Sequence, residues 1–245
     1  MDDASKAEAK KGWYQRWLSA DGYLGLHLTI GFAIALITGI VFKLIANEVF
    51  ETPKIRSADM AAQMFVNSIY SPILTSVMIG ITSFGDWGSI VTLSLIVGFL
   101  LFVDSSHRRL YTFTSIVAGG CLLNVLLKLS FHRGRPDATQ LVIAHGYSFP
   151  SGHAMGSMLF FGGLAYVVFF TVQRHPVWRF LGVLGCLIAI LLIGFSRIYL
   201  GVHYLSDVAA GFVAGLFWIG ICLTGTEGWI RLRDRRRKRA INHTL

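Results

Sequence analysis

Residues 177–207 read VWRFLGVLGCLIAILLIGFSRIYLGVHYLSD, and this stretch decides the fold. Its first part, Val177–Phe195, is apolar apart from Arg179 and is long enough to cross a bilayer as a helix, which takes about 20 residues. Its second part places a serine, an arginine, a histidine and an aspartate directly after that apolar run. The sequence therefore predicts a membrane-spanning helix whose end carries a group of polar residues.

The composition of the whole chain supports a membrane protein. Hydrophobic residues make up 54% of the 245 residues and charged residues only 14%, whereas soluble domains carry about 25% charged residues. Five more runs are long and apolar enough to span a membrane: Leu24–Ile45, Trp87–Val103, Leu110–Phe131, Ala154–Val172 and Val208–Thr224. We therefore predict an all-α, polytopic membrane protein with six transmembrane helices.

The stretch Ser57–Phe84 is less uniformly apolar. Apolar residues such as Ile73 and Val77 recur at helical spacing, but serine, threonine and asparagine residues are interleaved with them. This pattern is typical of helix at the membrane interface, and Pro72 and Gly85 are expected to break it. We predict interfacial helical segments here, between the first and second spans.

The positions of the basic residues orient the predicted spans. With six spans and a cytoplasmic N-terminus, most basic residues lie inside, as the positive-inside rule requires: Lys10, Lys11, Arg16, Arg108, Arg109, Arg174, Arg179 and the tail Arg231–Arg239. A seventh span at residues 57–84 would place several of them outside. We expect a basic cytoplasmic N-terminus at residues 1–23, a membrane domain at residues 24–224 and a basic cytoplasmic tail at residues 225–245.

The net charge of +9 indicates partners as well as orientation. The charge lies in short segments between apolar runs, which is typical of a plasma (inner) membrane protein whose basic ends contact anionic lipids. A nucleic-acid partner is not expected, because the charge forms no patch on a soluble domain.

One group of basic residues breaks the positive-inside rule. Lys128, His132, Arg133 and Arg135 lie at the outer end of the third predicted span, and Arg197 lies at the outer end of the fifth. Cations kept on the periplasmic or extracellular face indicate an anion-binding site there.

Three polar segments converge on that face in the predicted topology: Lys128–Pro136, Pro150–His153 and Ser196–Asp207. Lys128, Arg135 and Arg197 supply positive charge, and the planar fork of arginine matches pairs of phosphate oxygens. Ser151 and Gly152 open a helix, where free backbone N–H groups and the helix dipole favour an anion. We predict that these five residues bind a phosphate group.

A histidine and an aspartate in the third segment suggest a nucleophile. His203 and Asp207 are four residues apart, so they share a face if both lie on one helix. The carboxylate would then hold one ring nitrogen and leave the other free to attack, while His153 is suited to protonate a leaving oxygen. Taken singly, these features also fit structural roles as a helix ion pair, a helix cap and a lysine at a span end.

At these residues the sequence resembles the type-2 phosphatidic acid phosphatase family. The family pattern is Lys-x6-Arg-Pro, Pro-Ser-Gly-His and Ser-Arg-x5-His-x3-Asp. It matches at every specified position: Lys128, Arg135, Pro136, Pro150, Ser151, Gly152, His153, Ser196, Arg197, His203 and Asp207. The resemblance implies that His203 becomes a phosphohistidine, Asp207 orients it, and His153 protonates the leaving group. It also implies that the phosphate is held by Lys128, Arg135, Ser151, Gly152 and Arg197.

The activity expected from the resemblance is hydrolysis of a terminal phosphate from a membrane lipid, without metal or other cofactor. Small bacterial members that act on phosphatidylglycerophosphate or undecaprenyl diphosphate look most similar, and lipid A phosphate and phosphatidate stay open as substrates. A soluble vanadium-dependent haloperoxidase shares the signature, but the six apolar runs argue against it.

Two alternatives use the same residues. A metal hydrolase would take His153, His203 and Asp207 as ligands, although three nearby cations would repel a metal ion. A lipid transporter of the same fold would keep the spans and lack turnover. Gly211 and Gly215 are expected to serve helix packing.

Overall fold

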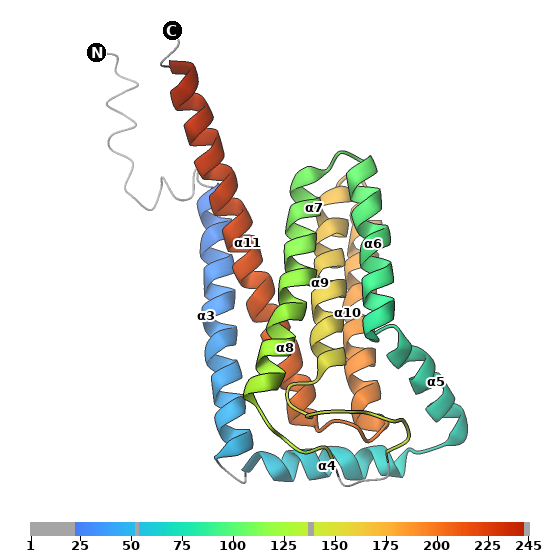
Figure 1. The fold of residues 1–245 in the computed structure, drawn as a ribbon. Coiled ribbons are helices and arrows are strands. Elements are labelled where there is room, and N and C mark those ends of the chain that lie inside the picture. The colour runs from blue at the N-terminus through green and yellow to red at the C-terminus, as the bar shows by residue number, and fades with distance from the viewer. Residues whose placement is uncertain (1–22, 52–53, 137–139, 243–245) are drawn as a thin grey trace.

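The structure is a computed structural model that describes residues 23–51, 54–136 and 140–242. The predicted basic N-terminus, residues 1–23, lies outside these ranges apart from Tyr23. All regular elements in the described ranges are helices (Figure 1): α3 (Tyr23–Phe50), α4 (Lys54–Ser68), α5 (Pro72–Ser83), α6 (Trp87–Val103), α7 (His107–Thr114), the π-helix η2 (Ser115–Gly119), α8 (Gly120–Ser130), α9 (Gly152–Thr171), α10 (Pro176–Tyr199) and α11 (Leu205–Asn242). The predicted all-α class is therefore confirmed.

Most of these helices are long and apolar enough to cross a membrane. Five satisfy both criteria: Thr29–Phe50, His107–Ser130, Gly152–Thr171, Pro176–Tyr199 and Leu205–Thr226. The pair α5 and α6, bent by 48° at the break between them, makes a sixth if the pair is one span. The predicted polytopic architecture is confirmed, with five or six spans.

Two short helices separate α3 from α6, where the sequence predicted interfacial segments. α4 lies across one end of the bundle (Figure 1). α5 begins at Pro72, directly after its N-cap Ser71, whose hydroxyl accepts a hydrogen bond from the Leu74 backbone N–H at 3.2 Å. The break between α5 and α6 contains Gly85, so Pro72 and Gly85 both interrupt the stretch as predicted.

α11 packs between α3 and α9, and glycines allow these helices to approach closely (Figure 1). A Cβ on Gly220 would lie 2.9 Å from the carbonyl oxygen of Gly31, and one on Gly215 would lie 2.6 Å from Met158 Cγ. The sixth span was expected to end at Thr224, but α11 continues to Asn242. Residues 225–242 contain no proline and are rich in arginine and lysine, which favour helix.

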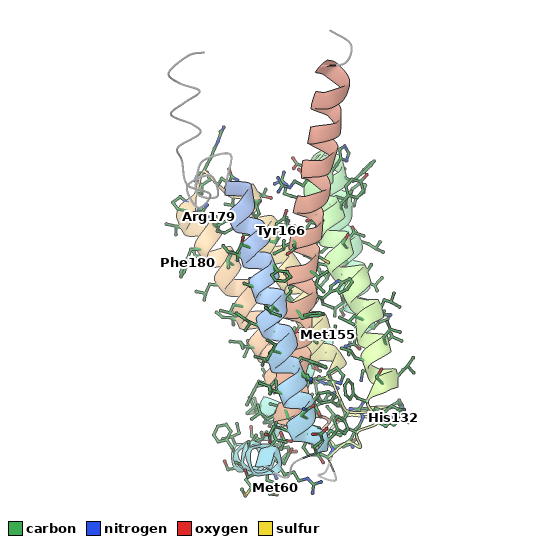
Figure 2. The ribbon with its side chains drawn as sticks, turned by 90° about the vertical axis from the view of Figure 1, so that its left-hand side faces the viewer. Met60, His132, Met155, Tyr166, Arg179 and Phe180 are labelled. Atoms are coloured by element: carbon green, nitrogen blue, oxygen red, sulfur yellow. The ribbon has the colours of Figure 1, made fainter. Side chains whose placement is uncertain are left out.

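The polar segments gather at the end of the bundle that α4 covers. The long loop between α8 and α9 runs beside α4 there (Figure 1). Figure 2 places His132 of that loop and Met60 of α4 at this end, and Arg179 at the other. The Ser148 backbone N–H donates to the Arg133 carbonyl at 2.9 Å, which ties the two limbs of the loop together. The loop is therefore held at the helix ends, where it can bring distant residues together.

We expect Gly211→Ala to destabilise the fold, because its Cβ would lie 2.7 Å from the backbone carbonyl oxygen of Ser151. Overpacking of this kind typically costs about 1–3 kcal/mol. Gly80→Ala is the matched control: nothing lies within 4 Å of its Cβ, and alanine is favoured over glycine in a helix by about 1 kcal/mol. Thermal unfolding in detergent should show a lower midpoint for Gly211→Ala only. Equal midpoints for the two variants would contradict the close packing of α9 on α11.

Candidate active site

The three polar segments meet at this end of the bundle, as the sequence predicted. They lie at the end of α8, at the start of α9, and between α10 and α11. Arg135 Nη1 lies 3.4 Å from His203 Nε2, and the Ser151 N–H donates to the backbone carbonyl of Asp207 at 3.0 Å. A Cβ on Gly152 would lie 3.4 Å from Lys128 Cε. All eight predicted site residues lie in or beside this cluster: Lys128, Arg135, Ser151, Gly152, His153, Arg197, His203 and Asp207.

The predicted histidine–aspartate pair is joined through a serine. His203 Nδ1 lies 3.6 Å from Asp207 Oδ2, which is too far for a direct hydrogen bond. Ser148 Oγ lies 3.2 Å from His203 Nδ1 and 2.5 Å from Asp207 Oδ2, so it bridges them. The two residues do not lie on one helix, because α11 begins at Leu205 and His203 lies in the turn before it.

The neighbours of His203 determine which ring nitrogen carries the proton. The Ser148 hydroxyl has one hydrogen and donates it to the Asp207 carboxylate, so its oxygen accepts from His203 Nδ1–H. On the other side of the ring, Arg135 has only donors to offer, so Nε2 must carry the lone pair. The imidazole therefore presents an unprotonated Nε2 beside a guanidinium.

The charge state of His203 agrees with this tautomer. Its side chain is 2% exposed. Burial is the main reason that the pKa of His203 falls to about 4, and Arg135 and Arg197 lower it too, against the opposing effect of Asp207. The imidazole is consequently neutral near pH 7, and Nε2 is available as a nucleophile.

The buried carboxylate of Asp207 is satisfied by two further donors. Arg133 Nη1 donates to Oδ1 at 2.6 Å, and the Tyr204 backbone N–H donates to Oδ2 at 2.9 Å. Arg133 also binds Asp59 of α4 at 2.8 Å, and Asp59 in turn accepts from the N–H and hydroxyl of Ser206 at 2.9 and 2.7 Å. Burial works against the charge of Arg133, but Asp207 and Asp59 outweigh it and raise the pKa of this residue.

The three predicted phosphate-binding cations hydrogen-bond only to neutral acceptors. Lys128 Nζ donates to the Tyr147 carbonyl oxygen at 3.1 Å, and Arg197 Nη1 donates to Thr82 Oγ1 at 2.8 Å. Arg135 donates to the carbonyl oxygens of Gly146, His145 and Val202 at 3.1, 2.7 and 2.8 Å. Among the described residues, none of the three forms an ion pair with a carboxylate. Arg197 is 5% exposed, and its buried Nε has no hydrogen-bond partner there. Because an unpaired buried cation is unfavourable, this arrangement favours a bound anion.

His153 pairs with a carboxylate from the break between α5 and α6. Its Nε2 lies 2.7 Å from Oδ1 of Asp86, the N-cap residue of α6. Gly85 packs tightly beside the ring, since a Cβ there would lie 3.1 Å from His153 Cδ2. His153 itself lies in the first turn of α9, after the N-cap Ser151. The bond to Asp86 engages Nε2 and leaves Nδ1 for another partner.

Sequence analysis missed several members of this cluster: Ser148, Asp86, Asp59 and Thr82. It counted Arg133 only as a cation on the outer face. Asp59 is the only acidic residue of α4, and Asp86 directly precedes an apolar span, so an isolated acid beside a helix was the available signal. Ser148 carries no such signal beyond its closeness to Pro150.

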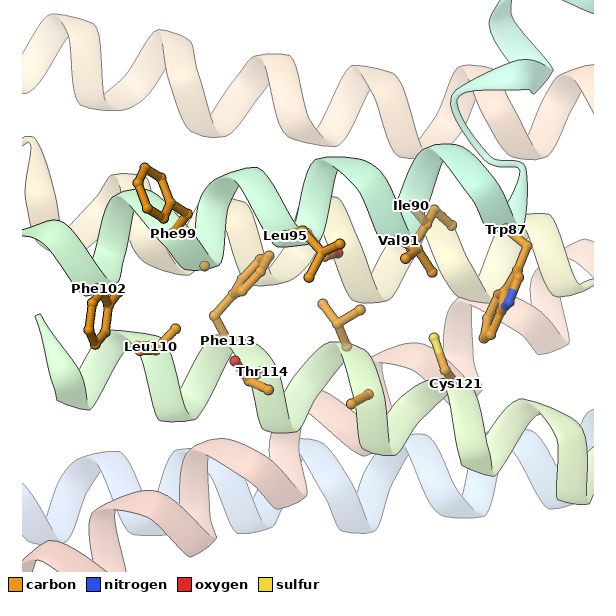
Figure 3. Close-up of a pocket in the computed structure, with 14 residues that line it drawn as sticks. Trp87, Ile90, Val91, Leu95, Phe99, Phe102, Leu110, Phe113, Thr114 and Cys121 are labelled. Atoms are coloured by element: carbon orange, nitrogen blue, oxygen red, sulfur yellow. The ribbon is translucent and has the colours of Figure 1, made fainter.

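Two adjacent cavities lie on one side of His153. A pocket of about 150 Å³ is lined by residues that include His153 and Asn124. An apolar groove of about 710 Å³ runs between α6 and the α7–η2 segment (Figure 3). The two cavities share the lining residues Trp87, Ile90 and Cys121. The pocket beside His153 therefore adjoins a hydrophobic groove that follows the helices.

The fold and the cluster together define a multi-pass helical membrane protein with a cationic site at one end of its bundle. The PAP2 superfamily model matches residues 109–231, a range that contains all three polar segments. The chain belongs to this superfamily.

Similarity to individual proteins extends beyond the matched range. The chain is 33% identical over 181 residues to phosphatidylglycerophosphatase B of Bacillus subtilis (strain 168), which covers 72% of this chain and 87% of that relative. It is 30% identical over 156 residues to undecaprenyl-diphosphatase BcrC of the same organism, covering 61% and 73% of the two chains. The crystal structure of a transmembrane PAP2-type phosphatidylglycerolphosphate phosphatase from Bacillus subtilis superposes with a TM-score of 0.72 at 28% identity, covering 80% of this chain and 96% of that one.

We expect His203 to make stability depend on pH. Its pKa is about 4 in the folded protein and 6.5 in a free side chain, so protons bind the unfolded chain more readily between these values. As the pH falls from 6.5 to 4, the wild-type protein should lose about 3 kcal/mol of stability through this group. His203→Gln removes the contribution, so its thermal midpoint in detergent should fall less over this range. The exposed His175 provides the control variant, His175→Gln, which should follow the wild type; parallel curves for all three proteins would contradict the burial effect.

Proposed function

We propose that this chain is a metal-independent lipid phosphatase that removes a terminal phosphate from a lipid phosphate or diphosphate through a phosphohistidine intermediate. The observation that carries the proposal is the group of three cations around His203, namely Lys128, Arg135 and Arg197, which have no carboxylate partner among the described residues. A phosphate group carries up to two negative charges and several acceptor oxygens, which matches three cations with free donors.

The attacking group in this proposal is Nε2 of His203. It bonds to phosphorus while the bond from phosphorus to the lipid oxygen breaks. Positive charge then develops on the imidazole, and the Ser148 hydroxyl and Asp207 carboxylate lie beside Nδ1–H to stabilise it. Arg135, which lies 3.4 Å from Nε2, is placed to hold the phosphoryl oxygens during the transfer.

The general acid in this proposal is His153. It gives its proton to the departing lipid oxygen and then takes one from the water that attacks the phosphohistidine, so that inorganic phosphate leaves and both histidines return to their first state. The Asp86 carboxylate, 2.7 Å from Nε2, fixes the orientation of the ring and leaves Nδ1 for the proton transfer. Gly152 at the start of α9 completes the phosphate site with its backbone N–H group. The Ser151 N–H is engaged by the Asp207 carbonyl, so Ser151 contributes to the site through its hydroxyl.

Independence from metal ions rests on the residues present. Lys128, Arg135 and Arg197 supply the positive charge that a divalent ion would otherwise bring to the phosphate. In the described ranges, no three histidine, cysteine, aspartate or glutamate side chains are grouped to hold a metal ion. Both observations favour the phosphohistidine route over the metal hydrolase alternative.

A lipid substrate is supported by the groove that leaves the site. Its apolar walls follow α6 through the membrane-spanning region and the adjoining pocket contains His153, so a hydrocarbon chain can lie there with its headgroup near His153. The names of the relatives make phosphatidylglycerophosphate and undecaprenyl diphosphate the leading candidates, with lipid A phosphate and phosphatidate as further ones.

The proposed orientation follows the distribution of basic residues. We place the protein in the plasma (inner) membrane with residues 1–23 and 225–245 in the cytoplasm, near anionic lipids, and the membrane domain at residues 24–224. The phosphate site then faces the periplasm or cell exterior, where the lipid headgroup and water are both accessible.

The two histidines should respond differently to substitution. We expect His203→Ala to reduce turnover by about 10³-fold or more on every substrate, because the attacking nitrogen is lost. His153→Ala should lose about 10²–10⁴-fold on a lipid phosphate, whose alkoxide needs a proton, but should still form a phosphoenzyme from an activated aryl phosphate. The measurement is turnover with both substrates and phosphoenzyme trapping by a denaturing, alkaline quench.

The control for this experiment is His175→Ala, an exposed residue at the far end of the bundle, which should retain activity on both substrates. A trapped adduct in His203→Ala would refute the nucleophile assignment. Equal losses of phosphoenzyme formation on the lipid and on the aryl phosphate in His153→Ala would refute the acid role.

Activity should survive removal of divalent ions. Phosphate release from the lipid substrate by the purified protein is expected to be the same, within about twofold, before and after EDTA treatment, because side-chain cations neutralise the phosphate. Loss of activity on chelation that a single divalent ion restores would overturn the metal-independent mechanism.

A further inference from the structure

Asn124 is a polar side chain that the proposed mechanism does not use. It lies on α8 one helical turn before Lys128 and lines the 150 Å³ pocket together with Gly152 and His153. Its Oδ1 and the Lys128 side chain approach the same point, since both lie within about 3.5 Å of the place where a Gly152 Cβ would be. The amide therefore lies directly beneath the phosphate site.

The amide of Asn124 lacks a donor partner. Its Nδ2 is buried and makes no hydrogen bond within the described ranges. An unsatisfied amide donor away from water is unfavourable, so a ligand oxygen in the pocket would gain a hydrogen bond that the protein does not supply. Rotation about the terminal torsion, which has broad minima, turns Nδ2 toward the pocket.

The depth of Asn124 restricts which lipid oxygen can reach it. Four residues of α-helix span about 6 Å, so the Cα of Asn124 lies about that far from the Cα of Lys128, on the side away from the headgroup. In a diacylglycerol phosphate, ester carbonyl oxygens lie at this distance from the phosphate and act as acceptors only. In a polyprenyl monophosphate, the same depth holds hydrocarbon.

We infer that Asn124 donates a hydrogen bond to an ester carbonyl of the substrate, and that it makes the site select diacylglycerol phosphates over polyprenyl phosphates. The inference rests on the proposed lipid phosphatase function and names the lipid class for that site. A hydrocarbon chain at this depth leaves the amide unpaired, and a site with an unpaired polar group discriminates against such a ligand. Beyond Asn124, we expect the hydrocarbon chain of the substrate to pass Trp87 and Cys121, which line both the pocket and the apolar groove.

A matched pair of substrates tests this inference. The ester is a diacylglycerol 3-phosphate, and its analogue is the dialkyl ether of the same chain length, which lacks the carbonyl oxygens and keeps the phosphate and the chains. For the wild-type protein we expect kcat/KM to be about tenfold higher for the ester. Asn124→Leu should lower kcat/KM for the ester to the level of the ether. It should leave the ether and a soluble aryl phosphate unchanged.

Asn67→Leu provides the control, because Asn67 is an exposed carboxamide on α4 outside the pocket, and it should retain the ester preference. A wild-type protein that hydrolyses ester and ether equally would overturn the inference while leaving the phosphatase function intact. The same conclusion follows if Asn124→Leu keeps the tenfold preference, or loses activity on the aryl phosphate in parallel. A wild-type protein that hydrolyses none of the three compounds and also leaves undecaprenyl diphosphate intact would refute the phosphatase function itself.

Discussion

The buried carboxylate of Asp207 is the charge around which this end of the molecule is organised. A carboxylate with no exposed surface is stable only when hydrogen bonds and a counter-charge surround it. Arg133 provides the counter-charge and a hydrogen bond, and Ser148 and the Tyr204 N–H provide further hydrogen bonds. Each of these contacts fixes the position of the segment that carries the donor. Arg133 and Ser148 fix the two limbs of the loop between α8 and α9. Through Asp59, Arg133 also ties that loop to α4, so one charge sets the positions of three segments.

The charges of the cluster divide into a paired set and an unpaired set. Asp59 and Asp207 share Arg133, and Asp86 takes His153. These bonds hold the two imidazoles in place, and they pair each of the three carboxylates Asp59, Asp86 and Asp207. Within the described part of the chain, the remaining cations Lys128, Arg135 and Arg197 hydrogen-bond to neutral partners only. This division explains how a site can be rigid without a ligand and still keep strong electrostatic attraction for an anion.

The spans and the meeting of the three polar segments could be predicted from the sequence, because hydrophobic length and basic loops determine which helix ends share a face. The hydrogen-bond network within the site could not be predicted from the sequence. His203 and Asp207 have helical spacing, yet the helix begins between them, and the contact passes through Ser148 instead. Asp59 and Asp86 reach the cluster from segments far away in sequence. Their contacts depend on how α4 and the bend before α6 pack in three dimensions, which no local pattern encodes.

The histidines and the apolar groove occupy separate parts of the chain. The histidines and their partners come from helix ends and loops, whereas the groove is walled by α6 along its length and by α7, η2 and the start of α8. Only the junction at Trp87, Ile90 and Cys121 belongs to both cavities. Exchange of groove side chains can therefore resize the apolar groove without disturbing the hydrogen bonds around the histidines. Such modularity lets one inherited reaction centre diverge toward different lipids by substitutions far from the chemistry.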